Sequence, residues 1–372
     1  MAKTVLGIDI GYDNLKLAIV NGRRVLKVGQ ASMPEKLMKE GRIVSVEAMG
    51  ELLKEAMKQN SLHCSRGGIV LTGPRVFVRN VTMPQMSTDQ LIYNLPYEFR
   101  DYITDELRDY AFDYAMISTR EEMTERRKAK ELAEAARQAG DSLNGFQDNG
   151  GQDFSSGDDG YKEEGGSSTM DLMAAAVPKQ QLEEAREILR RGGLKMVKAA
   201  PSICAYSSLI RNHEAATGQK GQEYCILDLG YQSIRMHVFR GENHMVTREL
   251  ETGLSLIDNT IAEVYNVDVH LAHTYLMTNH DNCQEKDVCV NTFTNISVEL
   301  MRALNFYRFS NQDSVLTDVW LCGGGAAIES LRLAIVNTLD MDVHPASELV
   351  MGGSEIPDCN TLIQAIGIAQ DL

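Results

Sequence analysis

One segment near the N-terminus of this 372-residue chain recurs, without a gap, in its second half. Aligning Asp9 with Asp228 places residues 7–22 against residues 226–241. The aspartate, the glycine two positions later, the tyrosine after it and the last glycine coincide, and the aliphatic positions match throughout. A repeat in two copies, rather than an array, indicates two domains built on the same strands.

Each copy predicts a β-hairpin that binds phosphate. An apolar strand leads into a tight turn that contains glycine, and a second strand and a polar turn follow. Successive N–H groups in such a turn form a concave site for an anion, and glycine lets a phosphate approach closely. An aspartate at the end of the first strand can hold a hydrated Mg²⁺. Asp-x-Gly can also be no more than the end of a strand, but that reading does not explain two copies in register.

Composition excludes several classes of function. The net charge of −15 argues against a broad surface for nucleic acid or anionic membrane. No apolar run approaches the roughly 20 residues that span a bilayer, and the N-terminus lacks the apolar segment of a signal peptide. We therefore expect a cytoplasmic protein. Seven cysteines without a CxxC pair indicate reduced thiols.

A group of potential zinc ligands lies in the second half. Their spacing fits no compact zinc motif, and a polar surface explains them adequately. These residues are His270, His273, His280, Cys283 and Cys289.

Periodicity and caps predict the elements between the two hairpins. Ser45 caps a helix, and Ser87 with Gln90 forms a capping box. Residues 121–139 form a charged helical stretch, and the Gly/Ser/Asp/Asn-rich tract 140–168 predicts a mobile loop. The other expected elements are strands at Gly68–Thr72, Val76–Met83, Tyr110–Ile117, Met170–Val177 and Lys195–Lys198, and helices at Lys179–Arg191 and Pro201–Ile210.

Beyond the second hairpin, a glycine turn is the main feature. The strand Val315–Leu321 ends in Cys322 and three glycines, and a helix over Ala326–Leu339 is expected directly after them. Such a turn can cradle a phosphate or ribose, because the helix dipole points at the ligand. By itself the signal is weak, since glycine turns often serve only packing. Helices are also expected at Gly253–Tyr265, Val269–Met277 and Thr294–Phe306.

The order of two Asp-Gly hairpins and a strand–glycine–helix resembles the superfamily of actin, DnaK-type chaperones and sugar kinases. Within it the chain resembles the FtsA/PilM branch, and most closely the PilM family of actin-like proteins of type IV pilus assembly. The resemblance implies an α/β fold: two duplicated actin-like (RNase H-like) domains around a nucleotide cleft, with an inserted small α/β subdomain. The residues that carry it lie at 7–17, 81–84, 93–98, 173–178, 190–197, 225–230, 248–253 and 365–369.

The resemblance also implies domain boundaries. Residues 1–83 and 199–221 would form the first domain, to which the C-terminal helix region 345–372 returns. Residues 84–198 would form the inserted subdomain, and 222–344 the second domain, with 259–314 as its outer subdomain.

By resemblance, the cleft would hold ATP and Mg²⁺. Asp9 and Asp228 would face the Mg²⁺ through water, and Lys16 would contact the phosphates. The two phosphate turns and the glycine segment supply the other expected nucleotide-binding residues: Gly11, Tyr12, Asn14, Gly230, Ser233, Gly323, Gly324 and Gly325.

Four residues depart from the small side chains usual in these turns: Tyr12, Asp13, Tyr231 and Gln232. An acidic Asp13 beside a triphosphate is unfavourable unless it points away or a metal offsets it. Arg235 has no clear role toward the nucleotide. We therefore expect ATP binding, with at most slow ATPase activity.

The resemblance favours an assembly scaffold held at the inner face of the cytoplasmic membrane by a partner. That partner would be the short cytoplasmic tail of a PilN-like membrane protein, bound between the inserted subdomain and the first domain. Pilus motor ATPases are a further implied partner, and self-association stays open. The alternatives are an FtsA-like cell-division protein, which normally ends in an amphipathic membrane helix, and a small-molecule kinase, for which no general base can be named.

Overall fold

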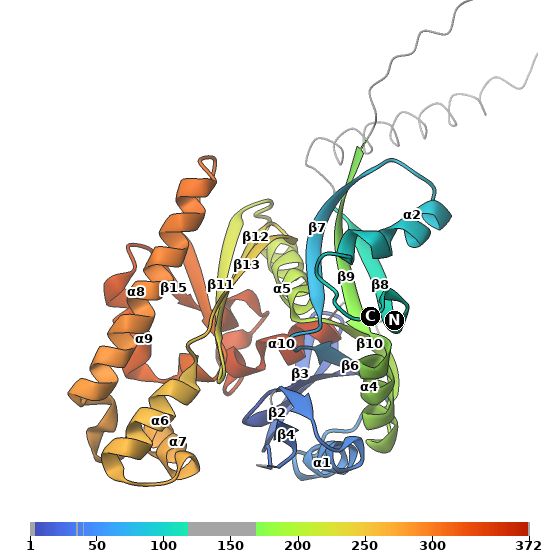
Figure 1. Ribbon diagram of the computed structural model, residues 1–372. Helices are drawn as coiled ribbons and strands as arrows, with labels where there is room; N and C mark the ends of the chain where they lie inside the picture. Colours follow the sequence, from blue (N-terminus) through green and yellow to red (C-terminus); the bar gives the residue numbers. More distant parts are fainter. Residues whose placement is uncertain (1–3, 35, 40, 118–168, 371–372) are drawn as a thin grey trace, which may run out of the picture.

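The computed structural model describes residues 4–34, 36–39, 41–117 and 169–370. The expected charged helix at 121–139 and the loop at 140–168 lie outside these residues. Two five-stranded sheets form the two halves, and a three-stranded sheet is attached to the first half (Figure 1). No helix in the described ranges is both long and apolar enough to cross a membrane.

The first sheet has the order β10-β6-β1-β2-β3. Its strands are β1 (Thr4–Ile10), β2 (Asn14–Asn21), β3 (Arg24–Ser32), β6 (Arg66–Leu71) and β10 (Lys195–Pro201), with the short hairpin β4 (Met38–Lys39) and β5 (Arg42–Ile43) beside it. Helix α1 (Val46–Gln59) packs against α4 (Lys179–Arg191). As expected, the side chain of Ser45 caps α1 by accepting the N–H of Ala48.

The second sheet has the order β13-β12-β11-β14-β15, which is the same order for equivalent strands. Its strands are β11 (Glu223–Leu229), β12 (Ile234–Arg240), β13 (Asn243–Leu250), β14 (Asp318–Cys322) and β15 (Asp342–Pro345). The accompanying helices are α6 (Leu254–Tyr265), α7 (Val269–Thr278), α8 (Asp287–Ser310) and α9 (Glu329–Thr338).

The duplication extends to the strand register. Asp9 pairs with Lys16 across β1 and β2, and Asp228 pairs with Arg235 at the equivalent position of β11 and β12. The second and third strands of each half also share an irregularity at the same point, after Ile19 in one copy and after Val238 in the other. Two actin-like domains of one topology are therefore confirmed.

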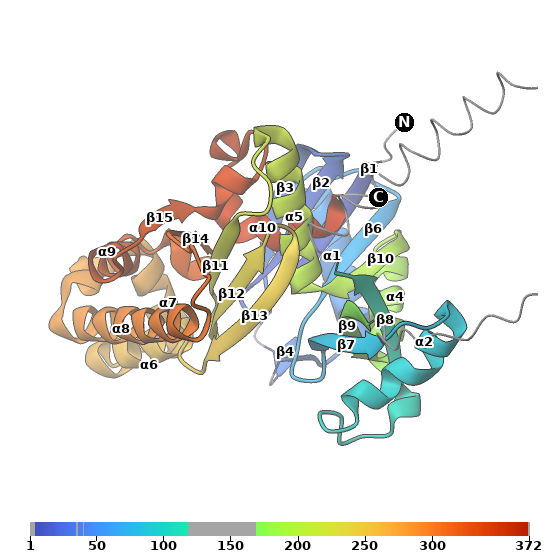
Figure 2. The same cartoon turned by 90° about the horizontal axis from the view of Figure 1, so that it is seen from above.

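Two helices join the halves. Helix α5 (Ser202–Thr217) and helix α10 (Cys359–Ala369) lie between the two sheets (Figure 2). They share one hydrophobic core with Val5 of the first sheet and Ile226 of the second. The helices approach so closely that a Cβ on Gly367 would lie 2.3 Å from the Ala205 carbonyl oxygen.

The small sheet has the order β7-β9-β8. Its strands are β7 (Phe77–Pro84), β8 (Tyr110–Met116) and β9 (Thr169–Pro178); α2 (Thr88–Asn94) and the 3₁₀ helix η1 (Leu95–Phe99) cover it. The capping box of Ser87 and Gln90 is present. This unit differs from the expected insertion at 84–198: β7 belongs to the small sheet, and β10 pairs with β6 of the first sheet. We therefore propose residues 77–178 as the inserted unit.

Candidate functional site

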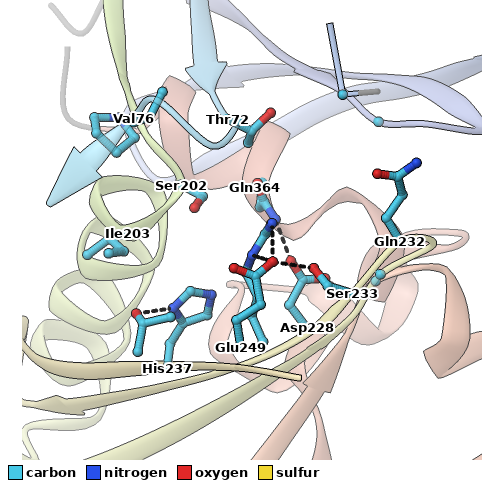
Figure 3. Close-up of a pocket in the computed structure, with 18 of the residues that line it drawn as sticks. Thr72, Val76, Ser202, Ile203, Asp228, Gln232, Ser233, His237, Glu249 and Gln364 are labelled. Atoms are coloured by element: carbon cyan, nitrogen blue, oxygen red, sulfur yellow. Dashed lines mark hydrogen bonds and ion pairs between the residues drawn. The ribbon is translucent and has the colours of Figure 1, made fainter. Parts of the chain in front are cut away.

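A cavity of about 970 Å³ lies between the two halves. The turn after β1, the turn after β11, the glycine segment after β14 and the facing strands β7 and β13 all line it. Figure 3 shows four of its lining side chains close together near the centre of the view: Asp228, Ser233, Glu249 and Gln364.

All but one of the residues predicted from the sequence to bind a nucleotide line this cavity. The residues that line the cavity are Asp9, Gly11, Tyr12, Asn14, Lys16, Asp228, Gly230, Ser233, Gly323 and Gly324. Gly325 does not line the cavity; it is buried, and a Cβ there would lie 2.7 Å from Cβ of Leu229. What these residues bind stays a prediction.

An ion pair stands at the end of the first strand. Lys16 Nζ lies 3.3 Å from Asp9 Oδ2, and both side chains are largely buried. Burial acts to lower the pKa of Lys16, but the carboxylates of Asp9 and Asp228 outweigh it and the pKa is raised. Lys16 is therefore protonated and places a positive charge in the cavity lining.

Asp228 is the buried carboxylate of the second half. Its Oδ2 accepts a hydrogen bond from Tyr206 Oη at 3.2 Å. It accepts another from Gln364 Nε2 at 2.9 Å (Figure 3). Burial raises its pKa, and the positive charge of Lys16 opposes that shift. Tyr206 and Gln364 were not predicted, because they reach Asp228 from other elements, 22 and 136 residues away along the chain. The one available signal was Gln364, a polar residue within the apolar stretch of α10.

The glycine segment is shaped around this carboxylate. A Cβ on Gly323, whose φ is +85°, would lie 2.6 Å from Asp228 Oδ1. The prediction of a helix directly after the glycines is wrong. A 3₁₀ turn covers Gly324–Ala327, and α9 begins only at Glu329, because the buried Ile328 has an extended backbone.

Arg235 and Ser233 share one partner. Ser233 Oγ donates to Glu249 Oε1 at 2.6 Å, and Arg235 Nη2 donates to the same oxygen at 2.8 Å. The hydroxyl of Ser233 is therefore committed to β13. Arg235 places a second cation in the cavity lining.

The bulky turn residues meet across the cleft. The rings of Tyr12 and Tyr231 are stacked, with centroids 4.8 Å apart and planes inclined by 8°. His273 meets Tyr231 edge-on at 5.9 Å, and its Nδ1 lies 2.8 Å from Oδ2 of the fully buried Asp258. Burial raises the pKa of the neighbouring Asp13. The two turns therefore touch through their side chains.

A buried pair of histidines also lines the cavity. His237 Nδ1 and His244 Nε2 lie 2.8 Å and 2.9 Å from the Thr247 hydroxyl, respectively. Burial lowers the pKa of His237 to about 3 and that of His244 to about 4, so both rings are neutral near pH 7.

The potential zinc ligands do not form a site. Across the described residues, no group of three or more His, Cys, Asp or Glu side chains could hold a metal ion. Cys283 and Cys289 belong to the core of the second half, and His280 stacks on Tyr275.

Comparison with known proteins extends these observations. The PilM–PilN type IV pilus biogenesis complex contains a chain with 19% identity and a TM-score of 0.73; the match covers 98% of this chain and 97% of that one. The ethanolamine utilization protein EutJ from Carboxydothermus hydrogenoformans has 12% identity and a TM-score of 0.54, over 99% of this chain and 89% of its own. These similarities show the shared actin-like fold.

Comparisons of the sequence identify the family, whereas the structural similarities show only the fold. No curated protein sequence matches this chain. The sequence profile of the family "Type IV pilus assembly protein PilM" matches residues 161–350, which is just over half of the chain. The resemblance noted from the motifs is thereby confirmed, and the chain belongs to the family of type IV pilus assembly protein PilM.

Proposed function

We propose that this chain is an ATP-binding, actin-like scaffold of type IV pilus assembly that binds the cytoplasmic tail of a PilN-like inner-membrane protein. The family match carries the proposal. The end-to-end likeness to a chain of the PilM–PilN complex supports it. The protein would then act at the inner face of the cytoplasmic membrane, where its partner holds it. Neither a cell-division role nor a kinase activity is favoured by these comparisons.

The cavity supports the nucleotide part of this proposal. Its volume of about 970 Å³ lies at the upper end of the roughly 300–1,000 Å³ of small-molecule sites. Lys16 and Arg235 supply positive charge for phosphates, and the turn at Gly11 leaves no room for a side chain, since a Cβ there would lie 2.9 Å from the Asn14 carbonyl oxygen. These residues fit a nucleoside phosphate.

We assign the nucleotide's parts to residues on the same grounds. Lys16 would contact the phosphates, and Gly323 and Gly324 would lie under the nucleoside and α-phosphate. Mg²⁺ would neutralise phosphate charge, and it usually keeps several waters while one or two carboxylates face it. Asp9 and Asp228 would provide those carboxylates. We expect at most slow hydrolysis, because Tyr12 and Tyr231 fill turn positions that small residues usually occupy.

The nucleotide site is tested by thermal unfolding with and without Mg²⁺-ATP. Ligand at about 100 times its Kd stabilises the native state by about 2.7 kcal/mol. Wild type should gain this stability, and Asp9→Ala should gain much less. Asp318→Ala is the matched control, because Asp318 is a carboxylate of β14 that pairs with His344 outside the cavity. Equal stabilisation of all three proteins would remove Asp9 from the site.

The partner site is expected between the small sheet and the first half. The unit at 77–178 exposes large apolar side chains on α2 and η1: Ile92, Tyr93 and Tyr97 are 60%, 71% and 48% exposed. Such a patch is typical of a surface that binds another protein.

The pull-down of a PilN-like membrane protein through its short cytoplasmic tail tests this part. A Tyr93→Ser, Tyr97→Ser double variant should retain less of the tail than wild type. Phe309→Ser is the control, since Phe309 is 82% exposed at the end of α8 in the other half. Rapid ATP turnover with a sugar acceptor, together with no captured tail, would refute the scaffold function.

A further inference from the structure

The two copies of the repeated turn contact each other through one residue each. Tyr12 follows Gly11 in the first copy, and Tyr231 follows Gly230 at the equivalent position of the second. Their rings lie 4.8 Å apart and nearly parallel. Stacked aromatic rings attract each other beyond the area they bury. The sequence repeat thus places one ring from each half where the halves face each other.

The backbone holds both rings in place. In the first turn, the Gly11 N–H donates to the Asn14 carbonyl at 3.0 Å, and the Met33 N–H donates to the Asp13 carbonyl at 2.8 Å. In the second, the Ser255 N–H donates to the Tyr231 carbonyl at 2.9 Å. Because each ring is anchored to its own half, parting the rings requires the two turns to move apart.

Side chains of the second half support the contact. His273 lies edge-on against Tyr231, and Asp258 holds the imidazole through Nδ1. Asp13, next to Tyr12, lies in the electrostatic field of both His273 and Asp258. The turn of the first half therefore faces side chains of α6 and α7 that a hydrogen bond already holds in place.

We propose that Tyr12 and Tyr231 form an aromatic clasp that closes the cleft in place of a nucleotide's terminal phosphates, so that ATP binds only when the rings part. The inference rests on the proposed nucleotide site. Both rings line the same cavity as the glycines that precede them, Gly11 and Gly230. A stack with 4.8 Å between centroids leaves no gap for a phosphate between its rings.

The clasp sets a preference for the length of the phosphate chain. AMP places its phosphate beside Gly323 and Gly324 and leaves the stack intact. ATP extends its β- and γ-phosphates between the turns and must break the stack. An aromatic pair shifts an equilibrium by roughly two- to tenfold. The clasp should therefore weaken ATP binding by about that factor and leave AMP binding unchanged.

Two measurements on the full chain test the clasp. The first is hydrogen exchange of the backbone at residues 11–14 and 230–233 in nucleotide-free protein. The second is calorimetric titration with ATP and with AMP. The variants are Tyr12→Ala, Tyr231→Ala, the double variant, and Tyr12→Phe as the control that keeps the ring.

Loss of either ring should speed exchange at the turn of the opposite half by roughly two- to tenfold. The double variant should match the single ones. In the single alanine variants the ratio of ATP affinity to AMP affinity should also rise by a similar factor. Tyr12→Phe should behave as wild type in both measurements.

Three results would overturn the clasp: faster exchange confined to the mutated turn, additive effects in the double variant, or a lower ratio of ATP affinity to AMP affinity after loss of a ring. The last would mean that the rings hold the ligand. If no variant binds ATP or AMP, the proposed nucleotide function fails, and the exchange measurement still decides whether the rings join the halves.

Discussion

At Gly323 the backbone passes directly beside the carboxylate of Asp228. A Cβ there would lie 2.6 Å from Asp228 Oδ1 and 2.7 Å from the Leu229 carbonyl oxygen. Its φ of +85° adds strain for any L side chain. Gly323→Ala should therefore lose stability in two ways: about 1–3 kcal/mol from the backbone conformation and a further 1–3 kcal/mol or so from the overlap.

Gly352→Ala is a control with a positive φ and no overlap. Gly352 has a φ of +69°, but a Cβ there would meet nothing within 4 Å. Urea denaturation should show only the backbone cost of about 1–2 kcal/mol for this control. If both variants lost the same free energy of unfolding, the contact of the added Cβ with Asp228 would contribute nothing to the loss.

His273 should make stability depend on pH. Its hydrogen bond with Asp258 raises its pKa above the ordinary value, despite burial, and Asp13 adds to the shift. A group with a raised folded pKa stabilises fully below its unfolded pKa, and that contribution is lost as pH rises through the folded pKa. The gap in unfolding free energy between wild type and His273→Gln should therefore be largest below about pH 6.5 and shrink above it.

His63→Gln is the control for loss of an imidazole: the exposed His63 ring lies with Nδ1 3.1 Å from the Ser61 carbonyl oxygen. A His273→Gln gap that is constant, or that widens at high pH, would show that Asp258 does not hold a charged imidazole.

Helix α10 packs closely against α5. In a helix interior, alanine is normally more favourable than glycine by about 1 kcal/mol. Gly367→Ala should nevertheless destabilise, by about 1–3 kcal/mol, because its Cβ would lie 2.3 Å from the Ala205 carbonyl oxygen of α5. Asn295→Ala, on the exposed face of α8, should show the propensity gain alone. Thermal unfolding compares the two, and a stabilised Gly367→Ala would contradict the close packing of α5 on α10.

Elements with strong local signals could be predicted from the sequence. Helix α4 has the predicted bounds Lys179–Arg191, and the capping box at Ser87 is present. Helix α8 starts at Asp287 rather than the predicted Thr294. Its first turns contain β-branched residues with weak helix propensity, and burial of Cys289 and Phe293 in the core compensates.

The candidate site was predictable where the repeat itself carries it. Asp9 and Asp228 lie at strand ends because the hairpin pattern places them there. The hydrogen bonds of Tyr206 and Gln364 to Asp228 join α5, α10 and β11. Gln364 lies 136 residues from Asp228, and a contact over that separation leaves no local pattern. The Tyr12–Tyr231 stack could be noticed as a departure in each copy, but the contact itself required the fold.

At the scale of the whole molecule, the small sheet reaches across the cavity to the second half. Asn80 Nδ2 of β7 donates to the His244 carbonyl of β13 at 2.7 Å. Both strands line the cavity, and β7 also belongs to the unit on which we place the partner site. This hydrogen bond would therefore connect the proposed nucleotide site with the proposed partner site.

Allosteric coupling is reciprocal, so ATP should change the affinity for the PilN-like tail as much as the tail changes the affinity for ATP. Asn80→Ala should reduce this coupling by roughly fivefold, the equivalent of one hydrogen bond of about 1 kcal/mol, while each ligand alone still binds. Thr82→Ala is the matched control: Thr82 lies two residues along β7, and its hydroxyl bonds Asp171 within the small sheet. The measurement is the Kd of the tail with and without ATP for the three proteins. Equal coupling in all three would show that the connection between the halves runs through α5 and α10 instead.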